Sequence, residues 1–155
     1  GGQEHGLRGG THNTAGIAAA ALAFELGVSE GCADAWQARE QTELLMTELH
    51  QKIADLVLVS GDSPRLMNTL NVRFIGADAE AVIANAPEIA VSTGSACNSA
   101  SPEPSHVLTA MGMPRQAAEE CIRFSVGRFT TTTEITRAVE IVTSAVTRVR
   151  QVTAA

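Results

Sequence analysis

The chain has 155 residues and is mildly acidic, with 11 Lys and Arg against 17 Asp and Glu and a formal net charge of -6. This length supports one domain with its own core or part of a larger one, and the negative charge argues against nucleic acid or an anionic membrane surface as a partner. The sequence has three cysteines, no signal-peptide pattern and no apolar run near the ~20 residues of a membrane span, which predicts a cytoplasmic protein, not a membrane protein, with reduced thiols.

The first third of the sequence predicts a glycine-rich loop followed by two helices. After the loop at residues 1–10, an alanine-rich and nearly apolar stretch from about 13 to 26 predicts a buried helix that stops at Gly27. We expect Ser29 to cap a second, longer helix to about Ala54, because its apolar residues recur at three- and four-residue steps. The sequence does not start with Met and opens within a loop pattern, so we expect a fragment of a longer protein.

The rest of the sequence predicts short strands that alternate with helices. Strands are expected at 56–59, 70–75, 89–92 and 121–126, and short helices at 79–86, 105–111 and 116–120. Thr131 and Glu134 form a capping box that predicts a last helix to about Arg150. The apolar face of that helix comprises Ile135, Val139, Val142 and Val146. The alternation predicts an α/β or α+β fold, in which helices pack against a small sheet.

Residues 91–105 place Cys97 among Gly, Ser, Ala and Asn residues. Such small residues bury little surface, so we expect a mobile loop and an exposed thiol that can act as a carrier or a nucleophile. The alternative is an incidental small residue in a loop. Cys32 and Cys121 lie in a helical and a strand pattern, and we expect both in the core.

Thiolate character makes a cysteine reactive, and the Cys97 loop contains no positive charge of its own. Arg123 and Arg128 are therefore the candidates to activate the thiol. An unpaired guanidinium in the apolar strand around Arg123 would be costly, so we expect Arg123 to meet a carboxylate.

The glycine-rich loop at the start opens a helix, where free N–H groups favour an anion, and Arg8 and Thr11 add donors. It is not a Walker A loop, because the Gly-Lys-Ser/Thr ending is absent. The alternative is a flexible loop with Thr11 as a helix cap. The 4 histidines are scattered and no metal-ligand spacing occurs, so we expect no metal site.

Four segments of the sequence match one known family in order and spacing. They are Gly1–Thr11 (GGQEHGLRGGT), Arg65–Phe74 (RLMNTLNVRF), Ser92–Ser101 (STGSACNSAS) with Glu103–Ser105 after it, and Ile122–Thr131 (IRFSVGRFTT). Together they resemble the C-terminal part of the NifS/IscS-type cysteine desulfurases, pyridoxal-phosphate enzymes of the class V aminotransferase family. The resemblance implies part of a fold-type I pyridoxal-phosphate enzyme. Residues 1–28 would be the last loop and helix of the large cofactor domain, and 29–155 the small domain with the cysteine loop.

The resemblance implies roles for three residues. Cys97 matches the catalytic cysteine, whose thiolate attacks the sulfur of cofactor-bound L-cysteine, so that L-alanine is released and Cys97 keeps the sulfur as a persulfide. Thr11 matches the threonine that reaches the phosphate of pyridoxal 5'-phosphate in the partner subunit of a homodimer. Arg123 matches the arginine that binds the substrate carboxylate. The long loop is typical of the NifS/IscS group and suits delivery of sulfur to an acceptor such as an iron–sulfur scaffold protein.

The chain departs from the family pattern in small and large ways. Gly9 stands where serine or alanine is usual, and Asn98 where threonine is common. The Schiff-base lysine of the family lies upstream of the matched part, and Lys52, on a charged helix face beside Glu48, cannot replace it. We therefore expect the isolated chain neither to hold the cofactor covalently nor to turn over cysteine, and to expose its apolar first helix.

Two other functions remain open. One is a related class V enzyme, either an aminotransferase, which needs no thiol, or a selenocysteine lyase. The other is a non-catalytic fragment that serves as a sulfur carrier or a dimerisation module.

Overall fold

The computed structural model describes residues 2–61, 63–94 and 104–153, so Cys97 and most of its loop lie outside the described residues. The elements are η1 (Glu4–Gly6), α1 (Thr14–Lys52), β1 (Leu56–Leu58), β2 (Thr69–Phe74), α2 (Ala79–Ala84), α3 (His106–Ala110), α4 (Arg115–Glu119), β3 (Cys121–Ser125) and α5 (Thr132–Thr153). The chain divides into two compact units, residues 1–34 and residues 35–155.

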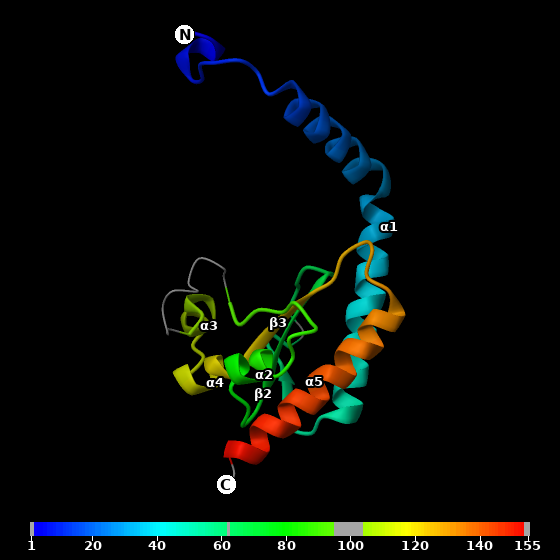
Figure 1. The fold of residues 1–155 in the computed structure, drawn as a ribbon, viewed down its shortest axis with the longest axis vertical. Helices are drawn as coiled ribbons and strands as arrows, with labels where there is room; N and C mark the ends of the chain where they lie inside the picture. The colour runs from blue at the N-terminus through cyan, green and yellow to red at the C-terminus, as the bar shows by residue number, and fades with distance from the viewer. Residues whose placement is uncertain (1, 62, 95–103, 154–155) are drawn as a thin grey trace. The chain divides into compact units, whose positions relative to one another are not determined.

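The second unit is built on a sheet whose described part has three antiparallel strands in the order β1-β2-β3 (Figure 1). Side chains alternate along β2, so Leu70, Val72 and Phe74 are fully buried on one face. The second half of α1, α2 and α5 cover this face and form one core with it. The predicted fold, a small sheet packed by helices, is confirmed.

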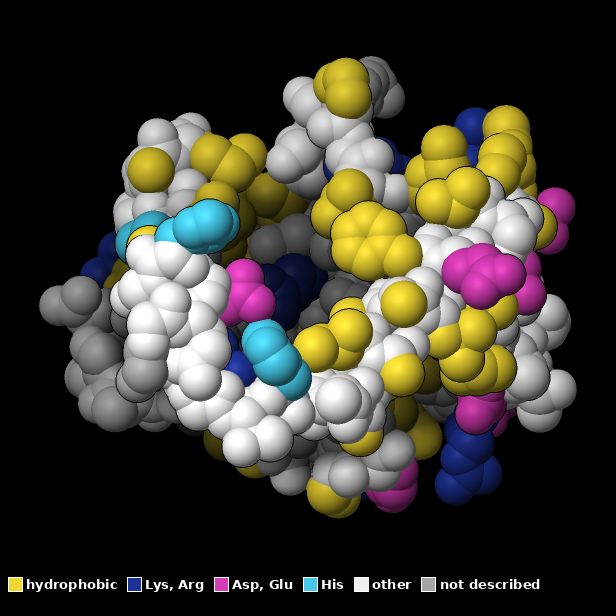
Figure 2. Space-filling view, turned by 90° about the horizontal axis from the view of Figure 1, so that it is seen from above, with side chains coloured by type: hydrophobic (Ala, Val, Ile, Leu, Met, Phe, Trp, Pro, Cys, Tyr) yellow, Lys and Arg dark blue, Asp and Glu magenta, His cyan; other side chains and the backbone are white. Residues whose placement is uncertain are grey.

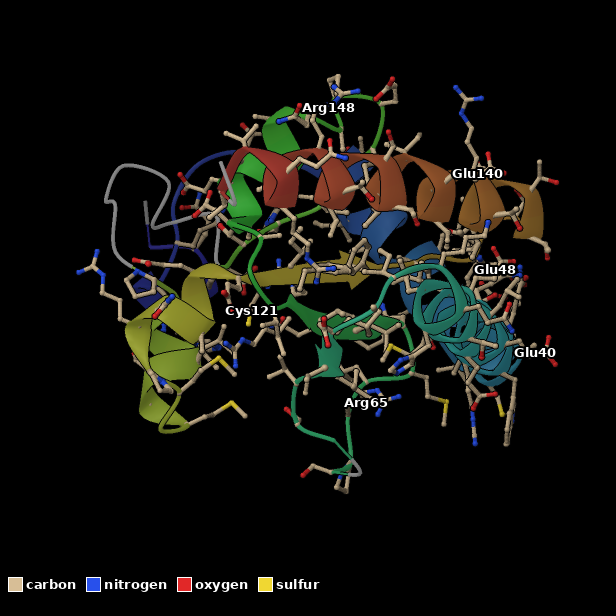
Figure 3. All side chains as sticks on the ribbon, turned by 90° about the horizontal axis from the view of Figure 1, so that it is seen from below. Glu40, Glu48, Arg65, Cys121, Glu140 and Arg148 are labelled. Carbon is tan, nitrogen blue, oxygen red and sulfur yellow. The ribbon has the colours of Figure 1, made fainter. Side chains whose placement is uncertain are left out.

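The opposite face of the sheet is partly covered by α3 and α4. Cys121 of β3 packs there with Val59, Leu108 and Ala118, in a cluster separate from the main core. Cys121 lies beside these two short helices in Figure 3. The rest of this face, toward the end of β3, is polar, and the candidate site lies on it.

Helix α5 begins as its capping box predicts. Thr131 N–H donates to Glu134 Oε2 at 2.8 Å, and Glu134 N–H donates to Thr131 Oγ1 at 3.3 Å. The expected apolar face of the helix is buried. This face packs against the second half of α1, where Thr136 Oγ1 also donates to Glu48 Oε1 at 3.0 Å.

The predicted break at Gly27 is wrong, because α1 is one helix of 39 residues. The Ser29 hydroxyl donates back to the Glu25 carbonyl at 2.9 Å, so Ser29 is an interior helical residue and caps nothing. A glycine costs an exposed helix about 1 kcal/mol, which the long alanine-rich stretch before it can absorb. The true cap is Asn13, whose Oδ1 accepts from Gly16 N–H at 3.0 Å.

The first part of α1 is exposed, contrary to the prediction of a buried helix. Within described residues 14–34 no side chain is buried, and Phe24 and Val28 are 79% and 85% exposed. Cys32 is also exposed, so its expected place in the core is wrong. Hydrophobic side chains are visible at the surface in Figure 2 (yellow).

By length and composition α1 is apolar enough to cross a membrane, with mean hydropathy 1.3 over its most apolar window, which corrects the expectation that no such stretch exists. One such helix is weak evidence for a membrane span, because core helices of soluble proteins have the same composition.

The predicted strand at 89–92 is also wrong. Ile89 N–H donates to the Ala86 carbonyl at 3.2 Å, which keeps the chain in a turn after α2. Of this segment, Ser92 alone joins the described sheet, through an isolated bridge to Arg123. That bridge positions the start of the cysteine loop.

Candidate functional site

The polar face of the sheet is produced by the alternation of side chains in β2 and β3. Thr69, Asn71 and Arg73 are half-buried on this face of β2, while the residues between them are buried. Asn71 lies directly opposite Arg123 of β3. Arg123 is exposed, so the guanidinium is accessible from solvent.

Arg123 is joined to the segment that leads into the cysteine loop. Arg123 N–H donates to the Ser92 carbonyl at 2.7 Å, and Ser92 N–H donates to the Arg123 carbonyl at 3.2 Å. The Ser92 hydroxyl donates to the Gly94 carbonyl at 2.6 Å and accepts from Gly94 N–H at 3.2 Å. Gly94 precedes Cys97 by three residues. The cysteine loop therefore begins at Ser92, which the two backbone hydrogen bonds hold beside Arg123.

A second arginine on this face, Arg73, is neutralised. Its Nε lies 2.6 Å from Glu120 Oε2, and the two side chains are 30% and 9% exposed. The other oxygen of Glu120 accepts from Gly76 N–H at 2.9 Å. A buried carboxylate with both oxygens hydrogen-bonded is a satisfied partner for Arg73, so Glu120 is not available to another cation.

Arg123 differs from Arg73 in this respect. The prediction that Arg123 meets a carboxylate is wrong for the described part of the chain, where its guanidinium has neither an ion pair nor a hydrogen bond. Arg123 lies in the middle of β3 on the polar face of the sheet, where its side chain is exposed, and the exposure removes the cost of an unpaired buried charge. An exposed, uncompensated guanidinium is suited to bind a carboxylate ligand.

Cys121 is buried, and its thiol is unreactive at neutral pH. Burial raises the pKa of the Cys121 thiol from 9.0 to about 11, while the charge of Arg73 opposes this shift and that of Glu120 adds to it. The thiol donates to the Ala117 carbonyl at 3.1 Å. At neutral pH it is fully protonated and a poor nucleophile, which confirms the expected core role.

Thr11 belongs to the other compact unit and is exposed. Arg8 Nη1 donates to the carbonyls of Thr11 at 3.2 Å and Gly10 at 3.4 Å, so Arg8 closes its own loop. Asn13 caps the helix, which rules out Thr11 as the cap and leaves its hydroxyl without a described hydrogen-bond partner. The Thr11 hydroxyl can therefore serve as a donor to an anion such as a phosphate.

The described residues do not fit a covalent site for pyridoxal phosphate. Lys52, the single lysine of the sequence, lies on the surface with its Nζ 3.9 Å from Glu48 Oε2. A Schiff-base lysine is normally desolvated and faces a cofactor pocket. Lys52 is instead exposed to solvent and lies beside Glu48. Within the described residues there is no group of three or more His, Cys, Asp or Glu side chains arranged to hold a metal ion.

A cavity of about 530 Å³ lies on the other side of β3, between that strand, residues 88–91 and α5. Apolar side chains such as Phe124, Ile135 and Ile141 line it, and Arg123 is not among its lining residues. The cavity is therefore separate from the polar face that holds Arg123.

Sequence reasoning missed Asn71, Ser92 and the Arg73–Glu120 pair. Asn71 and Arg73 occupy alternate positions of a predicted strand, so period-two patterning places them on one face. No sequence signal identifies their partners, because Glu120 lies 47 residues from Arg73.

The comparisons with known proteins agree on one family. The model of the family "Aminotransferase class-V" matches residues 2–138. A cysteine desulfurase of Frankia sp. (strain EuIK1) is 48% identical over 153 residues, which cover 97% of this chain and 36% of that protein.

Solved structures give the same result. A NifS-like protein from Rickettsia africae ESF-5 superposes with a TM-score of 0.76 and 29% identity, over 97% of this chain and 38% of that one. SspA in complex with cysteine superposes with a TM-score of 0.53 and 34% identity, over 84% of this chain and 35% of that one. The chain thus spans little more than a third of the length of these relatives.

Proposed function

The chain belongs to the class-V aminotransferase family, and from this premise we propose that it is the C-terminal portion of a cysteine desulfurase. In the complete enzyme, pyridoxal 5'-phosphate would supply an electron sink for the bound amino acid. Arg123 would bind the carboxylate of L-cysteine, and the Thr11 hydroxyl would donate to the phosphate of the cofactor held in the partner subunit. The Cys97 thiolate attacks the substrate sulfur, so that the carbon–sulfur bond breaks, L-alanine leaves and the sulfur remains on Cys97 as a persulfide.

One observation supports this proposal most directly. Of the two arginines on the polar face, Arg73 is paired with Glu120, whereas Arg123 has no carboxylate among the described residues. Arg123 is also joined by two backbone hydrogen bonds to Ser92, from which the loop toward Cys97 departs. Arg123 can bind the carboxylate of an amino acid, and the loop that carries Cys97 begins beside it. This arrangement suits a thiol that reacts with a bound amino acid.

We test the proposal on the complete protein by measuring alanine and sulfide release from L-cysteine. Cys97→Ala should abolish both products, and Cys32→Ala, at an exposed position on α1, should leave them unchanged. Unchanged release by the Cys97 variant would refute the role of this thiol.

Arg123→Lys tests the carboxylate contact separately. A hydrogen bond to a charged group is worth about 1.5–3 kcal/mol, so loss of the bidentate fork should raise KM for L-cysteine about 10- to 100-fold. The same change at the exposed Arg137 of α5 is the control. An unaltered KM in Arg123→Lys would remove this residue from the site.

The relatives also inform the remaining parts of the proposal. We assign residues 1–28 to a large cofactor domain and 29–155 to a small domain, and the two compact units, which meet after residue 34, support a division near this point. The complete enzyme would be a cytoplasmic homodimer that passes its persulfide sulfur to an acceptor such as an iron–sulfur scaffold protein. Light scattering on the complete protein and transfer of radioactive sulfur to a scaffold protein test these two assignments.

Product analysis separates the alternatives. An aminotransferase would release a keto acid, and a selenocysteine lyase would prefer selenocysteine to cysteine. An imine absorbance band from the isolated chain with pyridoxal phosphate would contradict the assignment of the lysine to the upstream part.

A further inference from the structure

Asn71 of β2 and Arg123 of β3 lie directly opposite each other in the antiparallel sheet. Both backbone hydrogen bonds of Arg123 go to Ser92, and the Asn71 carbonyl accepts from Val59 N–H on the other side, at 2.8 Å. The Asn71–Arg123 pair is therefore a non-hydrogen-bonded pair of the antiparallel ladder. In such pairs the Cα atoms are about 4.5 Å apart and the side chains lie closer together than in hydrogen-bonded pairs.

The side-chain oxygen of Asn71 is buried without a partner. Asn71 Oδ1 is closed to solvent, and no described residue donates a hydrogen bond to it. Such an atom costs free energy that water cannot recover, because water does not reach it. A buried amide oxygen in a folded strand therefore calls for a donor from a neighbouring side chain.

Arg123 is the neighbour that can supply this donor. Arg73 lies two residues along the same strand face, where its Nε is bonded to Glu120, whereas Arg123 lies directly opposite Asn71. The guanidinium of Arg123 has several N–H groups, and none is hydrogen-bonded to a described residue. Because the two residues lie directly opposite each other on one face, a side chain as long as that of arginine spans the distance to the amide oxygen.

We propose that Asn71 is a positioning residue for Arg123. Its amide oxygen accepts one N–H of the guanidinium and fixes the plane of the fork, so that the outward pair of N–H groups faces the carboxylate of an amino-acid substrate. Fixed orientation matters because a bidentate contact between arginine and carboxylate needs both N–H groups in line with the two oxygens. The inference deepens the proposed function and rests on it for the identity of the substrate.

The test uses two readouts on the complete enzyme. The first is the rate at which phenylglyoxal modifies Arg123, followed by peptide mass spectrometry, which needs no catalytic activity. The second is KM and kcat for L-cysteine. Three variants are compared with the unaltered enzyme: Asn71→Leu, Asn71→Asp and Thr69→Val. Thr69 is the control because it lies two residues away on the same face and opposite Ser125.

Opposite shifts of the two readouts identify the contact. In Asn71→Leu the guanidinium loses its acceptor, so labelling should be several-fold faster and KM should rise about 5- to 10-fold with little change in kcat. In Asn71→Asp a carboxylate pairs with Arg123 and competes with the substrate, so labelling should slow while KM again rises. Thr69→Val should change neither readout. A role in sheet stability alone would not slow labelling in one variant and speed it in the other.

The failure of each proposal is distinguishable. Equal labelling rates in the unaltered enzyme and Asn71→Leu would overturn the positioning role, whatever the kinetics. If the unaltered enzyme releases no alanine from cysteine, the proposed function fails, and the labelling pattern alone then decides whether Asn71 positions Arg123.

Discussion

Arg150, near the end of α5, should hold the C-terminal end of this helix to the sheet. Its Nε donates to the Ile75 carbonyl at 3.0 Å, Nη1 to Ala54 at 2.9 Å and Nη2 to Asp55 at 3.0 Å. These carbonyls lie in two turns, one between α1 and β1 and the other after β2. One planar guanidinium thus joins three parts of the chain far apart in sequence.

Replacing Arg150 by Met keeps most of the side-chain volume and removes all three hydrogen bonds. Hydrogen bonds from charged donors contribute about 1.5–3 kcal/mol each, but the three acceptors belong to exposed residues and regain water on loss of the arginine. We therefore take about 0.5–1 kcal/mol per bond, and about 1.5–3 kcal/mol for the set. Because the acceptors are neutral, the loss should persist at high salt, unlike that of a surface ion pair.

Hydrogen exchange of the complete protein measures this effect locally. A loss of about 1.5–3 kcal/mol corresponds to about 10- to 150-fold lower protection, expected for amides of β1, β2 and the last turns of α5. Arg148→Met is the matched control, because Arg148 points away from the sheet and makes one contact, to Asn85 Oδ1 at 3.3 Å (Figure 3). Equal protection in the Arg150 and Arg148 variants would refute the reasoning.

Three further predictions concern titratable groups. Two hydrogen bonds from Thr131 lower the pKa of Glu134 below its usual value of 4.5. The charged Glu134 therefore stabilises the fold at neutral pH, and this stabilisation is lost as the pH falls from 4.5 through the lowered pKa. Glu134→Gln should lower the Tm at pH 7 but not at pH 2. Burial raises the pKa of Cys121 to about 11, so iodoacetamide at pH 7.5 should label Cys32 and spare Cys121, and equal labelling would contradict the packing. Glu120→Gln leaves the half-buried Arg73 without its counter-charge and should lower the free energy of unfolding in urea by about 1–3 kcal/mol. Glu119→Gln, in the exposed pair with Arg115, should lower it by less than about 0.5 kcal/mol. Similar losses in the two variants would show that burial of the ion pair is irrelevant.

Local signals in the sequence predicted most elements correctly. The capping box at Thr131 and the apolar positions of α5 depend on residues three or four apart, so they could be recognised without the fold. The alternation at 70–75 predicted β2 for the same reason. The Gly27 break failed because a weak local preference was read as a stop, whereas α1 continues through it.

The family match came from short motifs, and so did the candidates Cys97, Thr11 and Arg123. Their chemical types and order along the chain are properties of the sequence, and the comparisons support the family to which they point. The sequence does not determine which charged side chains form ion pairs, because the partners come together only in the folded chain.

Tertiary structure decided the state of the two arginines on the polar face. Both lie in strands, and a carboxylate partner was predicted for Arg123, yet it is Arg73 that pairs with Glu120, while Arg123 has a solvent-exposed position beside Ser92. Strand register placed Asn71 against Arg123, and burial closed its amide oxygen to water. A sequence specifies which groups are present, but their free energies depend on distances across strands, and only the folded sheet brings these groups within reach of one another.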